Sequence, residues 1–192
     1  GIVTNNSDII DNSIIGENHY SWSIYLTGDD NNISNNNITN MSYGINTDGQ
    51  SDNVIDGNTI QVSNTGINGN NANNLTITNN TIETGSGTVV YTSNGQSNIK
   101  HNLLISNSGR GIHCENQAGE EFSNNTIIGS GGGGDYGIHI SNLSQPVVRN
   151  NIIQGFQNGI YDDNALSNYN LAFNDLWEIS GSLFEGTNLP PL

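Results

Sequence analysis

"LTITNNTI", residues 75–82, alternates apolar and polar residues on both sides of a doubled asparagine. Alternation of this kind predicts two short β-strands, and the doublet marks a turn between them. The second asparagine of the doublet, or its equivalent, recurs about every 22 residues along the chain. Aligning the sequence on it gives the column Asn12, Asn36, Asn58, Asn80, Asn102, Asn125, Asn151 and Asn170.

Apolar columns accompany the asparagine column in most of the repeats. An isoleucine or its equivalent stands shortly before and shortly after the asparagine, as Ile77 and Ile82 do around Asn80. A further apolar position usually follows a glycine, as in "YGIN" and "NGIY", and gives the column Ile45, Ile67, Val89, Ile112, Ile138 and Ile160. Each repeat therefore holds three short strands and three turns, and no window carries a sustained helical period.

Stacking such repeats places equivalent residues one strand spacing apart, at about 4.8 Å. An asparagine at the same turn of every coil can donate amide hydrogen bonds to one neighbouring coil and accept them from the other. Asparagine as a mere turn former explains its abundance, at 37 residues, but does not explain its regular spacing. The sequence therefore predicts an asparagine ladder.

This repeat resembles that of the right-handed parallel β-helix proteins, the pectate-lyase-like solenoid superfamily. The resemblance covers residues 1–165 and implies an all-β, single-stranded right-handed parallel β-helix of about eight coils of ~22 residues. Residues 166–192 lose the repeat, gather Phe173, Trp177 and Phe184, and end in prolines, so they are expected to form an irregular cap or junction. The superfamily includes polysaccharide lyases, glycoside hydrolases, epimerases, phage tailspikes and non-catalytic surface proteins, so the fold does not select an activity.

The charge of the chain restricts its partners. Eighteen acidic and three basic residues give a net charge of −15. Phosphates would be repelled, which argues against nucleic acid and anionic membranes, and an acidic polysaccharide would need calcium. No stretch is long and apolar enough for membrane insertion.

Other features bear on location. Cys114 is the single cysteine, so no internal disulfide can form, and its alignment with Ile140 predicts a small core residue. The acidity and the resemblance favour an extracellular or cell-surface location. Acceptor sequences for N-glycosylation occur at Asn5, Asn32, Asn37, Asn40, Asn74, Asn79, Asn124 and Asn142, although chance produces many of these in so asparagine-rich a chain.

The first residues predict a partner at one end of the solenoid. "GIV", residues 1–3, has the glycine-led strand pattern, so the sequence is expected to begin in the middle of a coil. Ile2, Ile9 and Ile14 would then face an open end with unpaired strand edges. We expect an upstream β-helix domain, or further copies of the chain stacked head to tail into a filament, to cover that end.

The glycine-led strands supply the candidate functional residues. Neighbours of an inward isoleucine point outward in a strand, and the glycines are expected to leave a bare trough there that suits an extended glycan. The predicted ligand-binding residues are Tyr25, Asn46, Asn68, His113, His139 and Tyr161, with Val90 in the same register. The catalytic candidates are His113 and His139 for acid–base chemistry, Glu115 and Asp163 as a carboxylate pair, and Arg110.

Several catalytic residues that enzymes of this superfamily use are missing from the sequence. Lyases of the superfamily generally use a lysine or arginine base, but Lys100 and Arg149 lie in asparagine-anchored strands, away from the trough. The paired aspartates and the "GHG" of polygalacturonase-like hydrolases are absent. No cofactor is expected, apart from weak Ca²⁺ binding at Asp29–Asp30 or Asp162–Asp163.

Three hypotheses follow from the sequence. The first is a non-catalytic extracellular structural protein, the second is a polysaccharide-degrading enzyme that uses the His113 and His139 side, and the third is a glycan-binding module without turnover. The missing base favours the first.

Overall fold

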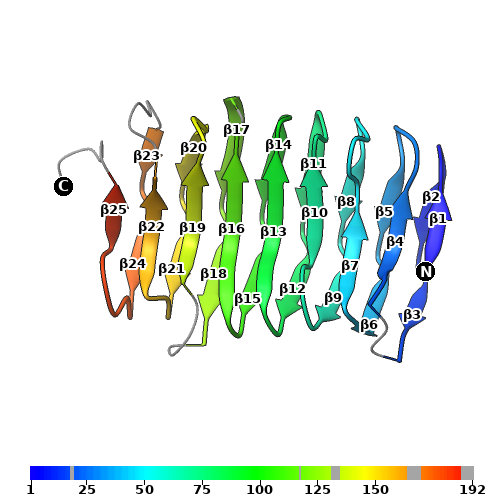
Figure 1. Cartoon of the computed structure of the whole chain (residues 1–192), viewed down its shortest axis with the longest axis horizontal. Coiled ribbons are helices and arrows are strands. Elements are labelled where there is room, and N and C mark those ends of the chain that lie inside the picture. Colours follow the sequence, from blue (N-terminus) through cyan, green and yellow to red (C-terminus); the bar gives the residue numbers. More distant parts are fainter. Residues whose placement is uncertain (18–19, 117, 131–134, 164–169, 187–192) are drawn as a thin grey trace.

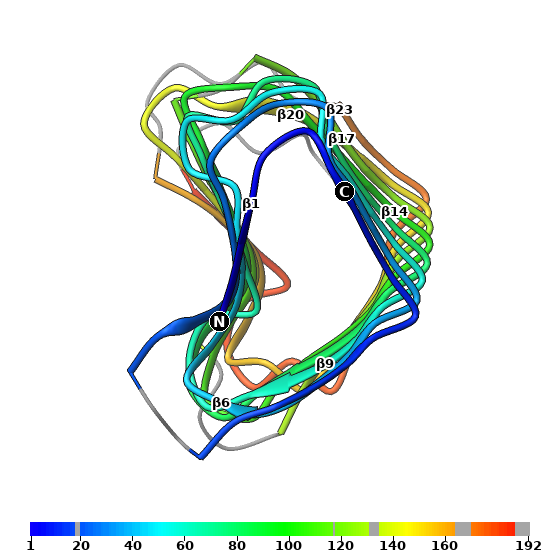
Figure 2. The same cartoon turned by 90° about the vertical axis from the view of Figure 1, so that its right-hand side faces the viewer.

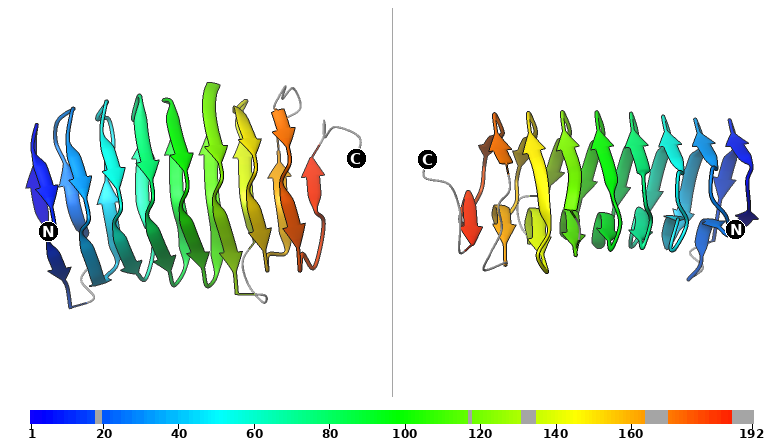
Figure 3. Two further views of the ribbon diagram at one scale, coloured as in Figure 1. Left: turned by 180° about the vertical axis from the view of Figure 1, so that it is seen from behind. Right: turned by 90° about the horizontal axis from the view of Figure 1, so that it is seen from above.

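The computed structural model describes residues 1–17, 20–116, 118–130, 135–163 and 170–186. Three parallel sheets wind around one axis and form a β-solenoid, with the strands of each sheet stacked along its length (Figure 1). Views from behind and from above show the same even stacking of coils (Figure 3). The predicted all-β solenoid of about eight coils is confirmed.

Each coil contributes one strand to each sheet. The first sheet runs β1 (Ile2–Thr4), β4 (Trp22–Leu26), β7 (Tyr43–Asn46), β10 (Ile67–Asn70), β13 (Gly87–Ser93), β16 (Gly109–Glu115), β19 (Tyr136–Ser141), β22 (Asn158–Asp162) and β25 (Phe184–Gly186). The second runs β2 (Asp8–Ile10), β5 (Asn32–Ser34), β8 (Val54–Asp56), β11 (Leu75–Thr78), β14 (Ser97–Lys100), β17 (Ala118–Ser123), β20 (Gln145–Arg149) and β23 (Asn170–Ala172). The third runs β3 (Ser13–Ile15), β6 (Asn37–Met41), β9 (Thr59–Val62), β12 (Thr81–Thr84), β15 (Leu103–Ser106), β18 (Thr126–Gly129), β21 (Ile152–Gln154) and β24 (Asp175–Trp177).

Stacked apolar side chains fill the interior. In the second sheet Ile55 pairs with Ile77, which pairs with Ile99, and all three are fully buried. Burial of one such side chain stabilises the fold by about 1.5 to 3 kcal/mol. Cys114 is buried in the same way, paired with Ile140 as the sequence predicts.

The asparagine ladder occupies the turn between the second and third sheets. Asn80 Oδ1 accepts hydrogen bonds from both the backbone nitrogen and Nδ2 of Asn58, at 2.8 and 3.0 Å. Asn80 Nδ2 donates in turn to Asn102 Oδ1 and to the Ile55 carbonyl oxygen. The same pattern links Asn12, Asn36, Asn58, Asn80, Asn102, Asn125 and Asn151. The ladder thus pairs turn groups that have no partner within their own coil.

A second, shorter ladder was not foreseen. Asn31 donates from its backbone nitrogen and Nδ2 to Asn53 Oδ1, and Asn31 Oδ1 accepts from the backbone nitrogen of Ser7. The column then changes to Leu75, and the buried Asn53 Nδ2 has no hydrogen-bond partner in the described structure. This ladder therefore ends where an apolar residue replaces the amide.

The last rung of the main ladder corrects the sequence alignment. Asn151 bonds to Asn174 Oδ1 through both its backbone nitrogen and Nδ2, so Asn174 is the eighth rung, and Asn170 is not. Asn170 lies in β23 and pairs with Val147 of the second sheet. Asn174 follows Asn151 by 23 residues, within the range of the earlier steps, whereas Asn170 follows it by only 19, so the shortened final step of the sequence alignment was wrong.

Residues 170–186 add an eighth coil instead of the expected irregular segment. Strands β23, β24 and β25 pair with β20, β21 and β22 in the three sheets. The three aromatic residues do not gather: Phe184 extends the inner column of Ile160, Trp177 points outward, and Phe173 is 88% exposed. The remaining residues of that segment, 166–169 and 187–192, lie outside the described ranges.

Candidate functional site

One outward column of the first sheet carries the predicted ligand-binding residues. The strand register stacks them in the order Val3, Tyr25, Asn46, Asn68, Tyr91, His113, His139, Tyr161 and Glu185. Tyr91, and not Val90, is therefore the member that β13 contributes. Val90 pairs with Ile67 and Ile112 and faces the core, because the chain is one residue longer here than in the neighbouring coil.

The glycines before this column face the interior and do not form a trough. A Cβ atom on Gly111 would lie 2.4 Å from Ile127 Cγ2, and one on Gly137 would lie 2.3 Å from Ile153 Cγ2. Both isoleucines belong to the core side of the third sheet. Side chains normally alternate between the two faces of a strand. This alternation breaks where the chain bends at the glycine, because the consecutive backbone nitrogens of Gly44 and Ile45 both donate hydrogen bonds to the next coil. The glycines therefore permit close packing of two sheets.

The wall formed by the first sheet is bent toward the interior (Figure 2). Its outer side is concave in profile, between the turns on either side of it. His113 and His139 point outward but are only 9% and 7% exposed. These two histidines are thus sheltered, whereas Val3 and Tyr25 of the same column are exposed, so the polar contacts of the histidines are screened less by water than ordinary surface contacts are.

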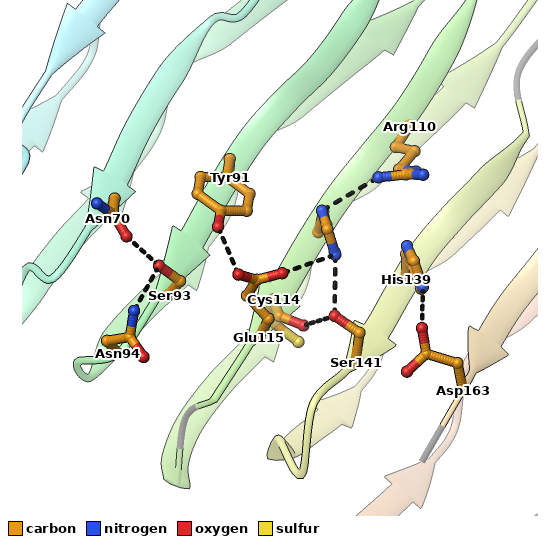
Figure 4. A network of polar contacts seen from close by, with 11 residues as sticks. Asn70, Tyr91, Ser93, Asn94, Arg110, Cys114, Glu115, His139, Ser141 and Asp163 are labelled. Atoms are coloured by element: carbon orange, nitrogen blue, oxygen red, sulfur yellow. Dashed lines mark hydrogen bonds and ion pairs between the residues drawn. The ribbon is translucent and has the colours of Figure 1, made fainter.

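Tyr91 and Glu115 make the first polar contact of the site. Tyr91 donates from its hydroxyl to Glu115 Oε1 at 2.9 Å, as Figure 4 shows. Burial, with a smaller contribution from Glu115, raises the pKa of Tyr91. The phenol therefore remains a hydrogen-bond donor across the physiological pH range.

His113 is held as a neutral ring. Arg110 Nη1 lies 3.2 Å from His113 Nδ1, and because a guanidinium can only donate, Nδ1 must accept. The proton then sits on Nε2, which donates to Ser141 Oγ at 3.0 Å, and Ser141 donates to the Cys114 carbonyl at 3.3 Å. Burial, together with His139 and Arg110, lowers the pKa of His113 to about 3.

His139 and Asp163 form a second pair one coil further along. His139 Nε2 lies 3.1 Å from Asp163 Oδ2, with the two side chains directed at each other in Figure 4. Burial lowers the pKa of His139 although Asp163 opposes the change, so the neutral ring donates from Nε2. Its buried Nδ1 has no hydrogen-bond partner in the described ranges.

Aromatic rings stack over these polar pairs. The His113 and His139 rings are parallel within 5°, with centroids 4.3 Å apart, and Tyr161 follows at 5.1 Å from His139. Tyr136 stacks on Tyr161 at 4.5 Å and lies 5.0 Å from His139. The guanidinium of Arg110 sits 5.7 Å above the Tyr136 ring. We call Tyr91, Arg110, His113, Glu115, Tyr136, His139, Tyr161 and Asp163 the ring cluster.

The structure brings together all five catalytic candidates and only part of the predicted binding residues. Arg110, His113, Glu115, His139 and Asp163 belong to the ring cluster, with His113 Nε2 lying 3.8 Å from Glu115 Oε2. Tyr25, Asn46 and Asn68 continue the column in earlier coils, where Asn68 Nδ2 bonds to Asn46 Oδ1 at 2.5 Å. Tyr91 and Tyr136 were missed in the sequence, since only the strand register aligns Tyr91 and only the fold brings Tyr136 to the column.

The other basic residues lie on the second sheet, as expected. Lys100 Nζ and Arg149 Nη2 each lie 2.6 Å from Glu121, and these two partners lower the pKa of Glu121 to about 2. Arg110 contacts no carboxylate within the described part of the chain. Arg110 is thus the single lysine or arginine in the first sheet.

The predicted calcium sites are not supported by the geometry. Asp162 is buried inside the solenoid whereas Asp163 points outward, so their carboxylates do not converge. Asp29 Oδ1 accepts from the Ser51 backbone nitrogen at 2.6 Å. Among the described residues no group of three histidine, cysteine or acidic side chains could hold a metal ion.

An acidic side chain also lies in the interior, behind the ring cluster. Glu120 is fully buried, and its Oε1 accepts from Thr92 Oγ1 at 3.3 Å and from Ser97 Oγ at 3.2 Å. Burial raises its pKa to about 8. The neighbouring thiol of Cys114 also has a raised pKa, chiefly because of burial. This interior group is neutral at pH 7 and is not accessible to a ligand.

Two surface hollows lie at the corner between the third and first sheets, in earlier coils. One of about 230 Å³ is lined by Asn40, Met41, Gln61, Val62, Ser63, Glu83, Gly85 and Asn107. The other, of about 390 Å³, is lined by Tyr20, Ser42, Ser63, Asn64 and Ser86. Neither includes a residue of the ring cluster.

Three parallel sheets and the asparagine ladder define a parallel β-helix protein. A family model described as a right handed beta helix region matches residues 22–176, so the chain belongs to that family. Searches of curated proteins and of solved structures gave no match. No helix in the described ranges could cross a bilayer.

Proposed function

We propose that this chain is a non-catalytic extracellular β-helix that binds a neutral polysaccharide along the outer face of its first sheet. The observation that carries the proposal is the ring cluster, in which stacked rings stand beside the carboxylates of Glu115 and Asp163 on the outer face of the first sheet. The stacked rings cover one another's faces, and the tyrosine hydroxyls, the carboxylates and Arg110 suit the hydroxyl groups of a sugar chain. The strand stacking places these groups in successive coils, from Tyr91 to Tyr161, along the direction in which an extended chain would lie.

The charges favour a neutral glycan over an acidic one. Arg110 shares the face with the carboxylates of Glu115 and Asp163, and the whole chain carries a net charge of −15. A polyanion would be repelled by this field, whereas neutral hydroxyls can bond to both signs of charge. His113 adds no positive charge, because its pKa is lowered to about 3.

The hydrogen bonds favour binding without turnover. Both ring nitrogens of His113 are occupied, by Arg110 and by Ser141, so this histidine has no lone pair left to act as a base. His139 with Asp163 is the one pair that keeps an unbonded ring nitrogen, and that nitrogen is buried. Incubation with a bound polysaccharide should therefore yield no shorter products. Turnover that His139→Ala abolishes would place the protein among the enzymes.

Native affinity electrophoresis in gels that contain a soluble polysaccharide tests the binding. We expect retardation by at least one neutral glucan, xylan or mannan and none by polygalacturonate or alginate. Tyr161→Ala should weaken the binding about tenfold, because it removes a hydroxyl group and the ring that stacks on Tyr136, worth about 1 kcal/mol or slightly more together.

Ser63→Tyr, which fills the corner hollows, is the matched control and should leave binding unchanged. Stronger retardation by the acidic polymers, or loss of binding in Ser63→Tyr alone, would contradict the proposal. Circular dichroism should show that both variants keep the β-fold.

Axial stacking is a second candidate role, favoured by the first coil. Strands β1, β2 and β3 are the end strands of the three sheets, with Ile2 and Ile14 only partly buried. A further coil, from an upstream β-helix or from another copy, could pair with these edges. Electron microscopy should then show filaments that Ile9→Lys disrupts, and a monomer at high concentration would contradict self-stacking.

A further inference from the structure

The outer face of the third sheet changes character along the solenoid. In the early coils its outward residues are mostly polar, as Thr39, Gln61 and Glu83 are. In the later coils apolar residues, which we call the apolar strip, stand beside the polar Thr126, Gln154 and Asp175; they are Leu103, Ile105, Ile128, Ile152 and Trp177. Ile105 pairs with Ile128, while Ile152 and Trp177 are 42% and 46% exposed. Gln154 stands between Ile128 and Trp177, and Thr126 stands between Leu103 and Ile152, so every later coil carries an apolar member of the strip but polar residues lie among them.

The apolar strip is not needed to fill the core. The inward positions of the same strands are already filled by Leu104, Ile127 and Ile153, which are fully buried. Apart from the exposed Ile15 in β3, polar residues stand at this outward column in the earlier coils of the same fold. A stripe of isoleucine on an otherwise polar surface is typical of a site where another molecule binds.

The charges around the apolar strip indicate the kind of partner. Glu83 lies beyond one end of the strip, and Asp175 and Glu178 lie at the other, where Glu178 accepts a hydrogen bond from Gln154. The three basic residues of the chain lie in strands of the other two sheets. A second copy would bring the same acidic rim and another net charge of −15, so self-pairing is disfavoured.

We propose that the apolar strip is the docking surface for a second protein, one that presents aliphatic side chains bordered by lysine or arginine. Its aliphatic residues would cover Ile105 and Ile128, and its basic residues would meet Glu83 and Glu178. Trp177 supplies an aromatic residue at the end of the contact, as hot spots of protein interfaces often do. This site lies on a different sheet from the ring cluster and does not depend on saccharide binding.

Trp177 provides the signal for a test. In a Trp22→Phe background it is the single tryptophan, and its emission should shift to the blue when a ligand covers it. The probes are two synthetic peptides, one alternating leucine and lysine and the other alternating leucine and glutamate. We expect a saturable shift with the first peptide and none with the second.

Matched variants separate the apolar strip from the rest of the sheet. Ile105→Gln with Ile128→Thr restores the polar residue types of the early coils and should weaken binding of the lysine peptide about tenfold or more. Thr39→Ser with Gln61→Asn, at the same outward column, should leave it unchanged. Equal binding of both peptides, or full binding by the first double variant, would overturn the proposal. A dimer in analytical ultracentrifugation that the first double variant abolishes would also overturn it, because the occupant would then be a second copy.

Discussion

Two columns of side chains run along the solenoid on the same backbone repeat and differ in how far their residues vary. The inner column at the turn is asparagine in every coil from Asn12 to Asn174. The outer column of the first sheet changes from Tyr25 through asparagine to His113, His139 and Tyr161. Inside, each amide must satisfy buried turn groups, so only one residue type fits. Outside, the backbone imposes no such demand, and chemically distinct groups can gather.

Replacing an inner rung should give the largest effect. Asn80→Ala removes the acceptor of the buried Asn58 nitrogens and the donor to the Ile55 and Thr78 carbonyls. Each buried group left unpaired costs about 1 to 3 kcal/mol, so the free energy of unfolding should fall by about 5 kcal/mol. Urea denaturation followed by circular dichroism measures it.

Asn12→Ala is the matched control for this change. Asn12 is an exposed end rung, and its lost partners can bond to water, so the cost should stay below about 1 kcal/mol. Equal losses in the two variants would show that the ladder stabilises the turns through local propensity and not through its buried hydrogen bonds.

The sequence was sufficient to predict the ladder and the three-strand coil, because one residue type repeats at a nearly constant spacing. It failed where coil length changes by a residue or more. The adjacent valines Val89 and Val90 look alike in the sequence, and only the strand pairing selects Val90 as the partner of Ile112. Asn174 was missed for another reason: Phe173 precedes it, so the asparagine doublet that marks several earlier rungs is absent there.

The candidate site could be predicted in part. Alternation within a strand correctly placed His113 and His139 on the outer face. The same alternation placed the glycines outside, which was wrong, because the bend at the corner turns both Gly111 and Ile112 inward. Contacts such as Arg110 with Tyr136 join neighbouring coils, and no spacing along one strand predicts them.

Replacing the buried Glu120 should give the second-largest effect. Glu120 belongs to an inward column of the second sheet that changes from Leu75 through Ser97 to Glu120. The pKa of Glu120 is raised from 4.5 to about 8, so the folded state holds its proton more tightly than the unfolded state does. The stabilisation is complete below pH 4.5, falls as pH rises, and is lost by pH 8. The free energy of unfolding should decrease by about 4 kcal/mol over this window.

Glu120→Gln keeps an acceptor for Thr92 and Ser97 and should remove that decrease. Glu121→Gln, on the opposite face of the same strand, should retain it and serves as the control. Urea denaturation at several pH values supplies the measurement. An unchanged slope in Glu120→Gln would mean that Glu120 is ionised in the folded protein.

The smallest effect concerns a turn position where the last coil departs from the others. Phe173 has a φ of 56°, whereas the equivalent turns hold Asp11, Asn35, Gly57, Asn79, His101, Asn124 and Asn150. Asparagine tolerates this left-handed backbone better than phenylalanine does, and Phe173 is 88% exposed. Phe173→Asn should therefore raise the free energy of unfolding by about 1 kcal/mol. A loss of stability would show that the phenyl ring makes contacts that hold the last coil.

The main proposal is that the groups that bind saccharide lie only in the later coils of the outer column. Polysaccharide binding by two matched triple variants tests it most directly. One variant carries Tyr91→Ala, His139→Ala and Tyr161→Ala, and the other carries Tyr25→Ala, Asn46→Ala and Asn68→Ala at the same column in earlier coils. With the neutral polysaccharide that retards the parent protein, we expect the first variant to lose retardation and the second to keep it, while both remain folded. Equal loss in both, or loss in the second alone, would contradict the account.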